Sequence, residues 1–351
     1  MLIHSKNKFF VDNILGPCIF ASQKWEKVDS SGFERDQRVK NENTAQISSI
    51  GHVPVLVDEV VQGLRCRLGG RFVDCTVGQG GLSFAILQAA GPRGFLLGID
   101  RDVSAVAAAK ERLNPFADRS HLIHGNFRDL KRHLEGSGLS TVNGIVFDLG
   151  VSSVQLDQPE RGFSFMVEGP LDMRMDRSGG VTAAGLLDQL SERELADVIF
   201  RYGEERYARR IARAIVTARA RRPLCTTRDL VDIIRDAVPA HYRHSRIHFA
   251  TRAFQAIRIA VNEELSVLEA SLRDAVDVLA PGGRLCVISF HSLEDRIAKQ
   301  TLRALAAGSA PPLALVTKKP MVASQQERDN NPRARSAKLR VAERIPVRRC
   351  A

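Results

Sequence analysis

Long hydrophobic runs are missing from this chain of 351 residues. No apolar stretch approaches the ~18 to 20 residues that a membrane-spanning helix needs, so we expect a protein that does not cross a membrane. The N-terminus also lacks the basic segment followed by an apolar segment that is typical of a signal peptide. The sequence therefore favours the cytoplasm, with the mitochondrial matrix as the alternative.

Closely spaced cysteines are missing as well. The six cysteines are scattered and form no C-x-x-C pair. Zinc sites and disulfide frameworks depend on such spacings, so we expect neither, and a reducing compartment fits best. The three histidines between 241 and 248 have no cysteine or carboxylate in that stretch to complete a ligand set, and we expect no metal site there.

Acidic residues are too few to balance the basic ones. The 51 Lys and Arg against 40 Asp and Glu give a net charge of +11, which favours a polyanionic partner. The length exceeds the ~250 to 300 residues that one core usually spans, so we expect two domains. The alternation of strands and helices stops between 153 and 250, which predicts a helical domain inserted into an α/β domain of residues 51–152 and 251–345. Residues 1–50 are expected to be a disordered extension.

A glycine-rich stretch ending at Ser83 has the layout of a nucleotide-binding βα unit: a short apolar strand, a tight turn and the start of a helix. Its spacing, Gly78-x-Gly80-x-x-Ser83, is not the dinucleotide fingerprint, because serine occupies the third glycine position. This disfavours the alternative of a dinucleotide-dependent oxidoreductase. Asp74-x-Thr76-x-Gly78-x-Gly80 instead resembles the first motif of class I S-adenosylmethionine (SAM) methyltransferases, with Thr76 where a glycine is usual.

Chemistry-bearing side chains follow the next predicted strands. Asp100 ends the second strand, where a carboxylate can bind two ribose hydroxyls, and Phe127 follows the third, where its ring either stacks on a purine or packs in the core. Asp148 ends the fourth strand, and Gln155 lies in the polar loop after it. Since ligands bind at the carboxyl ends of parallel strands, we expect one pocket there. Asp148 either accepts a hydrogen bond from an amino group about to be methylated or anchors the loop.

His291 follows a later apolar strand, at the same expected edge of the sheet. Its ordinary pKa lies near neutrality, so it is a candidate general base. Holding the loop or the substrate is the alternative role.

Arginines gather in the insert. Residues 201–222 hold eight arginines against Glu204 and Glu205, and several share a stripe beside an apolar helix face. Because arginine pairs with phosphate and releases counterions, this predicts contact with an RNA or DNA backbone, with a solvated surface as the alternative. The candidates for RNA binding are Arg206, Arg209, Arg210, Arg213, Arg243 and His244.

Together, the motifs over residues 51–345 resemble the RsmH (older name MraW) methyltransferases. The resemblance rests on 52–56, 78–81, 98–102, 148–157, 161–165, 169–176, 202–206, 288–296 and 331–336. It implies a class I SAM-dependent methyltransferase, with a Rossmann-like, mostly parallel sheet and the helical insert. The implied SAM contacts are Gly80, Gly81, Leu82, Asp100, Phe127, Asp148 and Gln155. Leu82 departs from the histidine of many relatives, so only its backbone amide could serve.

The resemblance also implies a reaction. RsmH enzymes methylate N4 of a cytidine in the decoding region of small-subunit (16S) ribosomal RNA, which links them to rRNA processing and ribosome biogenesis. The implied mechanism is in-line attack of the cytosine amine on the SAM methyl group, with the target base turned out of its stack. The implied partner is the RNA or the assembled small subunit. A SAM-binding assembly factor without turnover is the alternative, and a homodimer remains open.

Overall fold

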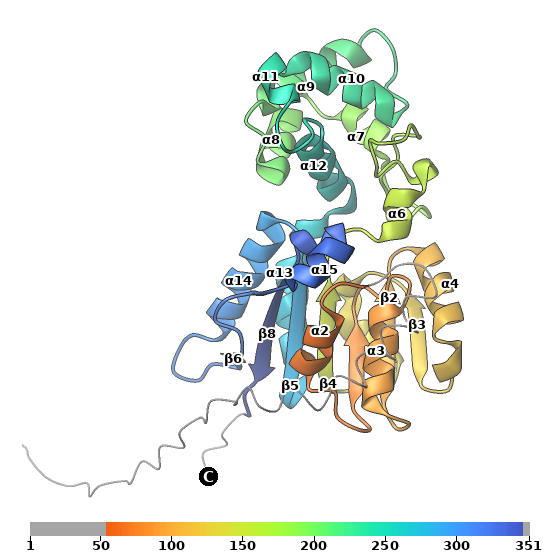
Figure 1. Ribbon diagram of the computed structural model, residues 1–351, viewed down its shortest axis with the longest axis vertical. Helices are drawn as coiled ribbons and strands as arrows, with labels where there is room; N and C mark the ends of the chain where they lie inside the picture. Colours follow the sequence, from red (N-terminus) through yellow and green to blue (C-terminus); the bar gives the residue numbers. More distant parts are fainter. Residues whose placement is uncertain (1–53, 347–351) are drawn as a thin grey trace, which may run out of the picture. The chain divides into compact units, whose positions relative to one another are not determined.

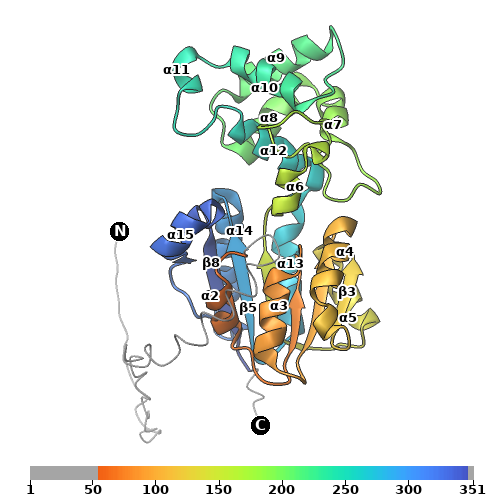
Figure 2. The same ribbon diagram turned by 45° about the vertical axis from the view of Figure 1, so that its right-hand side comes forward.

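The computed structural model describes residues 54–346. The predicted N-terminal extension, 1–50, lies outside the described residues. Within them, one eight-stranded sheet has the order β3-β2-β1-β4-β5-β8-β6, and β7 pairs with β8 (Figures 1 and 2). The strands are β1 (Arg71–Asp74), β2 (Phe95–Asp100), β3 (Ser120–His124), β4 (Val142–Asp148), β5 (Leu279–Ser289), β6 (Leu313–Leu315), β7 (Met321–Val322) and β8 (Lys338–Arg344).

The strands β1 to β5 pair in parallel, and only β8 and its partners are antiparallel, as far as residues 54–346 show. Neighbouring residues alternate between two cores, because side chains of a strand point to opposite faces in turn. In β1, for example, Phe72 packs in one cluster and Val73 in the other. Both faces are therefore buried, which is why these strands read as nearly continuous apolar runs.

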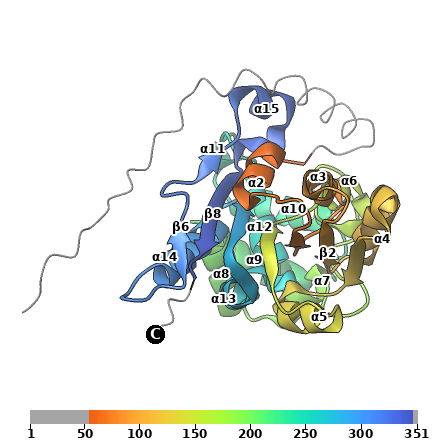
Figure 3. The same ribbon diagram turned by 90° about the horizontal axis from the view of Figure 1, so that it is seen from below.

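Helices cover both faces of the sheet. One face carries α2 (Val57–Leu64), α3 (Gly81–Ala90) and α4 (Val103–Arg112), and the other carries α5 (Leu130–Gly136), α13 (Glu264–Val278) and α14 (Ser292–Leu305), as Figure 3 shows. This arrangement brings the carboxyl ends of β1, β2, β4 and β5 to one edge, where the site lies.

The segment between β4 and α13 is helical and has its own hydrophobic cluster. Its elements are α6 (Ser153–Asp157), η4 (Pro159–Arg161), α7 (Ala183–Gln189), α8 (Glu192–Gly203), α9 (Ala208–Arg219), α10 (Thr227–Ala237), α11 (Ala240–Arg243) and α12 (Thr251–Asn262). Reciprocal capping boxes start three of them: Ser152 with Gln155 at α6, Ser191 with Glu194 at α8 and Thr226 with Asp229 at α10. Its separate role in substrate recognition remains a prediction.

Apolar periodicity predicts one long helix over 251–279 and another over 191–220, but the structure divides each of them in two. The first breaks at Glu263 and the second at Glu204, and both residues adopt left-handed backbone conformations. At the first break, the Asn262 side chain donates to the Met173 carbonyl and accepts from the Met175 amide. Apolar residues keep their helical spacing on both sides of such a break, so the sequence pattern does not show where the chain changes direction.

The segments around β5 and before β8 differ from what the sequence pattern predicts. The apolar run predicts a strand from Arg284, but β5 begins at Leu279, and the sheet register shifts opposite Val142 and Gly144. The polar, basic composition of 308–332 predicts a linker, but this segment contains β6, β7 and α15 (Gln325–Asn330), and it leads into η5 (Pro332–Arg335). Two further short turns are η2 (Asn114–Phe116) and η3 (Phe127–Asp129). None of the helices in residues 54–346 is long and apolar enough to cross a membrane.

Candidate active site

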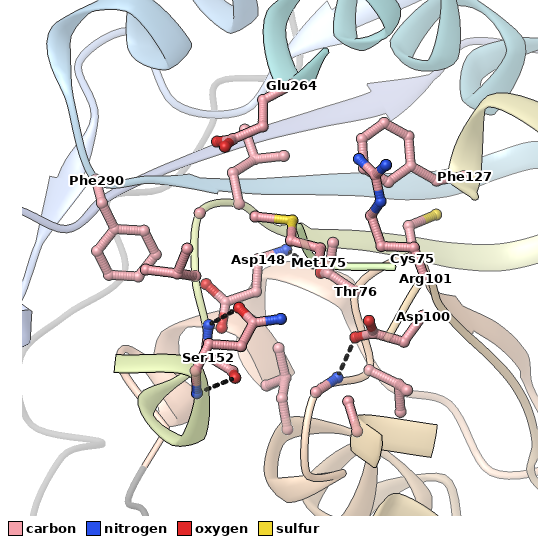
Figure 4. Close-up of a pocket in the computed structure, with 18 of the residues that line it drawn as sticks. Cys75, Thr76, Asp100, Arg101, Phe127, Asp148, Ser152, Met175, Glu264 and Phe290 are labelled. Atoms are coloured by element: carbon pink, nitrogen blue, oxygen red, sulfur yellow. Dashed lines mark hydrogen bonds between the residues drawn. The ribbon is translucent and has the colours of Figure 1, made fainter. Parts of the chain in front are cut away.

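A cavity of roughly 290 Å³ opens at the carboxyl ends of β1, β2, β4 and β5 (Figure 4). Of the predicted cofactor and catalytic residues, the structure brings Gly81, Leu82, Asp100, Phe127, Asp148, Gln155 and His291 to its wall. Gly80 adjoins this wall as the residue that begins α3. The carboxyl ends of these strands therefore meet at one pocket, as the sequence predicts.

The glycine turn after β1 is closely packed. Gly80 has a φ of 76°, a conformation that favours glycine, and a Cβ at Gly81 would lie 2.5 Å from Pro54. Leu82, in contrast, packs its side chain into the core while also lining the cavity. The turn thus brings its backbone to the cavity wall together with the polar residues Thr76 and Gln79.

Ser83 has a structural task that its position in the motif did not reveal. Its hydroxyl donates to Asp74 Oδ2 at 2.7 Å, and Asp74 also accepts from the Thr76 amide. Burial nevertheless raises the pKa of Asp74 to about 6, against these hydrogen bonds. The Thr76 hydroxyl in turn accepts from the Asp148 amide at 2.7 Å, so both departures from glycine brace the turn.

Asp100 is held by backbone amides. Its Oδ2 accepts from Gly78 at 2.8 Å and its Oδ1 from Asp102 at 2.9 Å. Burial raises its pKa to about 6, although both hydrogen bonds favour the charged form. Each carboxylate oxygen has a second acceptor position, so Asp100 can still bind ligand hydroxyls.

Phe127 packs in the core and also reaches the cavity wall, and its stacking on a purine remains a prediction. Its ring packs edge-on against Phe147, with centroids 5.4 Å apart, and it also lines the cavity. A ring fixed by the core in this way presents a preset apolar wall to a ligand.

Among the carboxyl groups that line the cavity, Asp148 has the pKa that is raised furthest above its ordinary value. Burial, followed by the nearby charges of Asp74 and Glu294, raises its pKa to about 8. Its Oδ1 is inaccessible to solvent and has no hydrogen-bond partner among residues 54–346. A buried acceptor of this kind is costly unless a ligand satisfies it.

Gln155 is committed to protein contacts. Its Oε1 accepts from the Ser152 amide at the start of α6, and its Nε2 donates to Asp102 at 2.8 Å. Asp102 also pairs with Arg161 at 2.7 Å, and both side chains are only 4% exposed. Arg161 donates to the carbonyl groups of Arg174 and Met175, so a buried network joins the cofactor side of the pocket to the insert.

His291 caps α14. Its Nδ1 accepts from the Glu294 amide, and Glu294 Oε2 accepts from the Phe290 amide. His291, Glu294 and Glu264 each place a possible metal-ligand atom within 4.8 Å of the others. Arg258 donates two hydrogen bonds to the Glu264 carboxylate, at 2.9 and 2.8 Å. The expectation of no metal remains a prediction.

The six candidates for RNA binding line no part of the described pocket. The side chains of Arg209, Arg210 and His244 are exposed. Arg206 lies over the rings of Tyr207 and Tyr242, at 4.8 and 4.9 Å. Arg213 pairs with Glu192 at 3.3 Å, and Arg243 donates to the Val238 carbonyl.

Several pocket residues were not predicted from the sequence. Met175 and Arg333 belong to the segments 169–176 and 331–336, which the resemblance quoted without assigning them chemistry, and Arg258 belongs to no motif. The signal for the first two was present in unusual local sequence. Arg258 gave no signal, because only the turn after α12 brings it to Glu264.

Comparison with known proteins decides the family. The MraW methylase family model matches residues 49–345. The chain belongs to the MraW methylase family. It is similar to the ribosomal RNA small subunit methyltransferase H of Geobacter sp. (strain M21), with 50% identity over 307 residues, 84% of this chain and 98% of the relative. The protein of that name from Citrifermentans bemidjiense is 51% identical over the same shares of both chains.

Family membership and geometry agree on the chemistry. The resemblance drawn from the motifs is confirmed, and so are the methyltransferase class, the Rossmann-like class I fold and SAM as methyl donor. The pocket fits that donor: the glycine turn lines it, Asp100 retains acceptor positions for hydroxyls, and Asp148 Oδ1, which has no partner in residues 54–346, can accept from an amine. The assignment of individual residues remains a proposal.

Proposed function

We propose that this methyltransferase places a methyl group on N4 of a cytidine in the decoding region of small-subunit (16S) ribosomal RNA. Two observations support the proposal. The relatives named for small-subunit RNA methylation match over nearly their whole length, and Asp148, whose buried Oδ1 has no hydrogen-bond partner in residues 54–346, lines the pocket. The cytoplasm, during ribosome assembly, is the corresponding place of action.

Each pocket residue has a proposed task. Asp100 binds the ribose hydroxyls, the glycine turn with Leu82 borders the amino-acid part, Phe127 borders the adenine, and Gln155 supports the wall beside Asp102. When bound, SAM supplies a methyl group activated by a positively charged sulfur. Asp148 orients the cytosine amine and takes up its proton, because the amine's lone pair is delocalised and positioning must compensate.

Methyl transfer to small ribosomal subunits that lack the modification tests the reaction. With radiolabelled SAM, we expect label in the RNA, recovered as N4-methylcytidine after digestion to nucleosides. Label in another nucleoside would contradict the proposed target. No transfer by a folded protein that binds SAM would favour the assembly-factor alternative and direct attention to Leu82.

We also propose that the insert, 153–250, binds the RNA around the target base. The exposed Arg209 and Arg210 and the stacked Arg206 support this, because their charges can pair with phosphate. Reversing the charge at Arg209 and Arg210 should weaken binding to the small subunit by about tenfold or more and reduce the salt dependence. The matched control reverses two exposed cations elsewhere, Lys110 and Arg132. Equal losses in both variants would argue against a specific role for the insert.

A further inference from the structure

Three residues that line the pocket carry a buried polar atom without a hydrogen bond in the described chain. The buried side-chain atoms of this kind in residues 54–346 are Arg101 Nε, Asp148 Oδ1, Arg161 Nε, Arg243 Nε and His291 Nε2. The three arginines bond protein carbonyl groups through their other nitrogens, Arg101 among them although it also lines the cavity. Asp148 and His291 line the cavity at the ends of β4 and β5, where they offer an acceptor and a donor to a ligand.

The hydrogen bonds of His291 indicate which of its nitrogens carries the proton. Its Nδ1 accepts from the Glu294 amide at 3.5 Å, so in the neutral ring the proton resides on Nε2. Nε2 lies 3.0 Å from Glu294 Oε1, but its N–H direction forms no hydrogen bond with any residue in 54–346. Because His291 also lines the pocket, we take this N–H as a donor for a ligand bound there. This disfavours the general-base role, because Nε2 has no lone pair for a proton.

The order of the strands places this donor on the side of the pocket where the base that accepts the methyl group would lie. Along the sheet the order is β2, β1, β4, β5, so Asp100, the glycine turn, Asp148 and His291 follow one another along the pocket edge. With a ribose at Asp100, the position beyond Asp148 is the farthest from the cofactor's sugar. Phe290, which precedes His291, also lines the pocket there and offers an aromatic face to a base (Figure 4).

An acceptor beside a donor matches one edge of cytosine. Cytosine presents an amino donor at N4 next to an acceptor at N3, whereas uracil presents an acceptor at O4 next to an N–H donor at N3. Enzymes that act on a flipped base read this edge by hydrogen bonds, and a buried group left unpaired rejects the wrong base strongly. We propose that His291 donates Nε2–H to N3 of the target cytosine while Asp148 accepts from its N4 amine.

This inference rests on the proposed function and gives His291 a role in specificity. The test compares small subunits assembled from RNA that carries either cytidine or 3-deazacytidine at the target position; the analogue replaces N3 by C–H. Affinity is measured in the presence of S-adenosylhomocysteine, so that no turnover occurs. The wild type should bind the 3-deazacytidine subunits roughly tenfold more weakly, the loss expected for one hydrogen bond.

His291→Ser is the informative variant, because serine can still cap α14 but cannot reach the base. It should lose a similar factor on cytidine and lose nothing more on 3-deazacytidine. The control Ser292→Ala alters the exposed neighbour and should discriminate like the wild type. If His291→Ser does not fold, His291→Asn, another helix-capping residue, carries the same comparison.

Three results would overturn the assignment. The first is a wild type that binds cytidine and 3-deazacytidine subunits with equal affinity. The second is a His291→Ser variant that still prefers cytidine subunits by the same factor as the wild type. The third is a variant that loses methyl transfer while its preference in binding is unchanged. The last outcome would restore the general-base role. Failure of the proposed function looks different, because the wild type would then not methylate the unmodified cytidine subunits at all.

Discussion

Asp100 and Asp148 end two strands of the same sheet and line the same pocket, yet their surroundings differ. Both oxygens of Asp100 accept backbone amides, from Gly78 and Asp102. Asp148 Oδ1 accepts from nothing in the part of the chain that the structure describes. Burial raises the pKa of Asp100 to about 6 and, together with the charges of Asp74 and Glu294, that of Asp148 to about 8.

The protein itself provides hydrogen-bond partners for the oxygens of Asp100, whereas Asp148 Oδ1, which has none in residues 54–346, depends on a ligand for a partner. Backbone amides favour the ionised form of Asp100 and fix its direction, so the protein alone prepares this carboxylate. Asp148 lacks that support, and its charge depends on what binds beside it. In the proposed assignment, the chain itself builds the cofactor side of the pocket at Asp100, whereas ligands complete the acceptor side at Asp148.

Removal of Asp148 should have the largest effect. Asp148→Ala should lower kcat for methyl transfer by about 10² to 10⁴-fold, the range for a positioned proton acceptor, measured with radiolabelled SAM under saturating substrates. Asp157→Asn, on the exposed end of α6, is the control and should stay near wild type. A loss of only a few fold in Asp148→Ala would place catalysis elsewhere.

Asp100 should affect binding rather than turnover. Asp100→Asn should raise KM for SAM by about 10 to 100-fold, because it removes a charged acceptor of hydroxyl groups, while kcat changes little. Steady-state kinetics with varied SAM measures this, with the exposed Asp118→Asn as control. An equal fall in kcat would show that the two carboxylates are not separated in function.

Proton release should report the state of Asp148. With a pKa of about 8, its carboxyl group is largely protonated at pH 7, and a bound sulfonium cation lowers that pKa. SAM binding near pH 7.5 should then release up to about one proton, and S-adenosylhomocysteine, which lacks the cation, should release less. Calorimetry in buffers of different ionisation enthalpy measures the release, and Asp148→Asn should abolish it. Identical release by the variant would contradict the assignment.

Ser83 extends the comparison to a third carboxylate, the fully buried Asp74. Ser83→Ala should lower the free energy of unfolding by about 1 to 3 kcal/mol, because it leaves a buried acceptor without its partner. Urea denaturation measures the change. Ser178→Ala is the matched control, since it removes a similar bond to Asp176 on the surface, and it should cost less than about 0.5 kcal/mol. Equal costs would mean that burial of Asp74 carries no penalty.

Much of the site could be predicted, because it follows strand ends that local sequence marks. Asp100, Asp148 and His291 come at or directly after the ends of apolar runs, and Phe127 follows the end of β3 after two residues. In a parallel sheet such positions converge. Gln155 was placed near the site, but its bond to Asp102 could not be foreseen, since the two residues are far apart in sequence.

The chain's own pattern determined the parallel α/β fold, the glycine turn and the order of acidic strand ends, because periodicity and turn chemistry act between residues close in sequence. Only the tertiary structure decided which buried groups found partners. It divided the helix at Glu263, satisfied Asp100 with two amides, and left Asp148 Oδ1 and His291 Nε2 without a partner in residues 54–346. Hydrogen-bond satisfaction depends on which segments meet in space, and no local pattern records that.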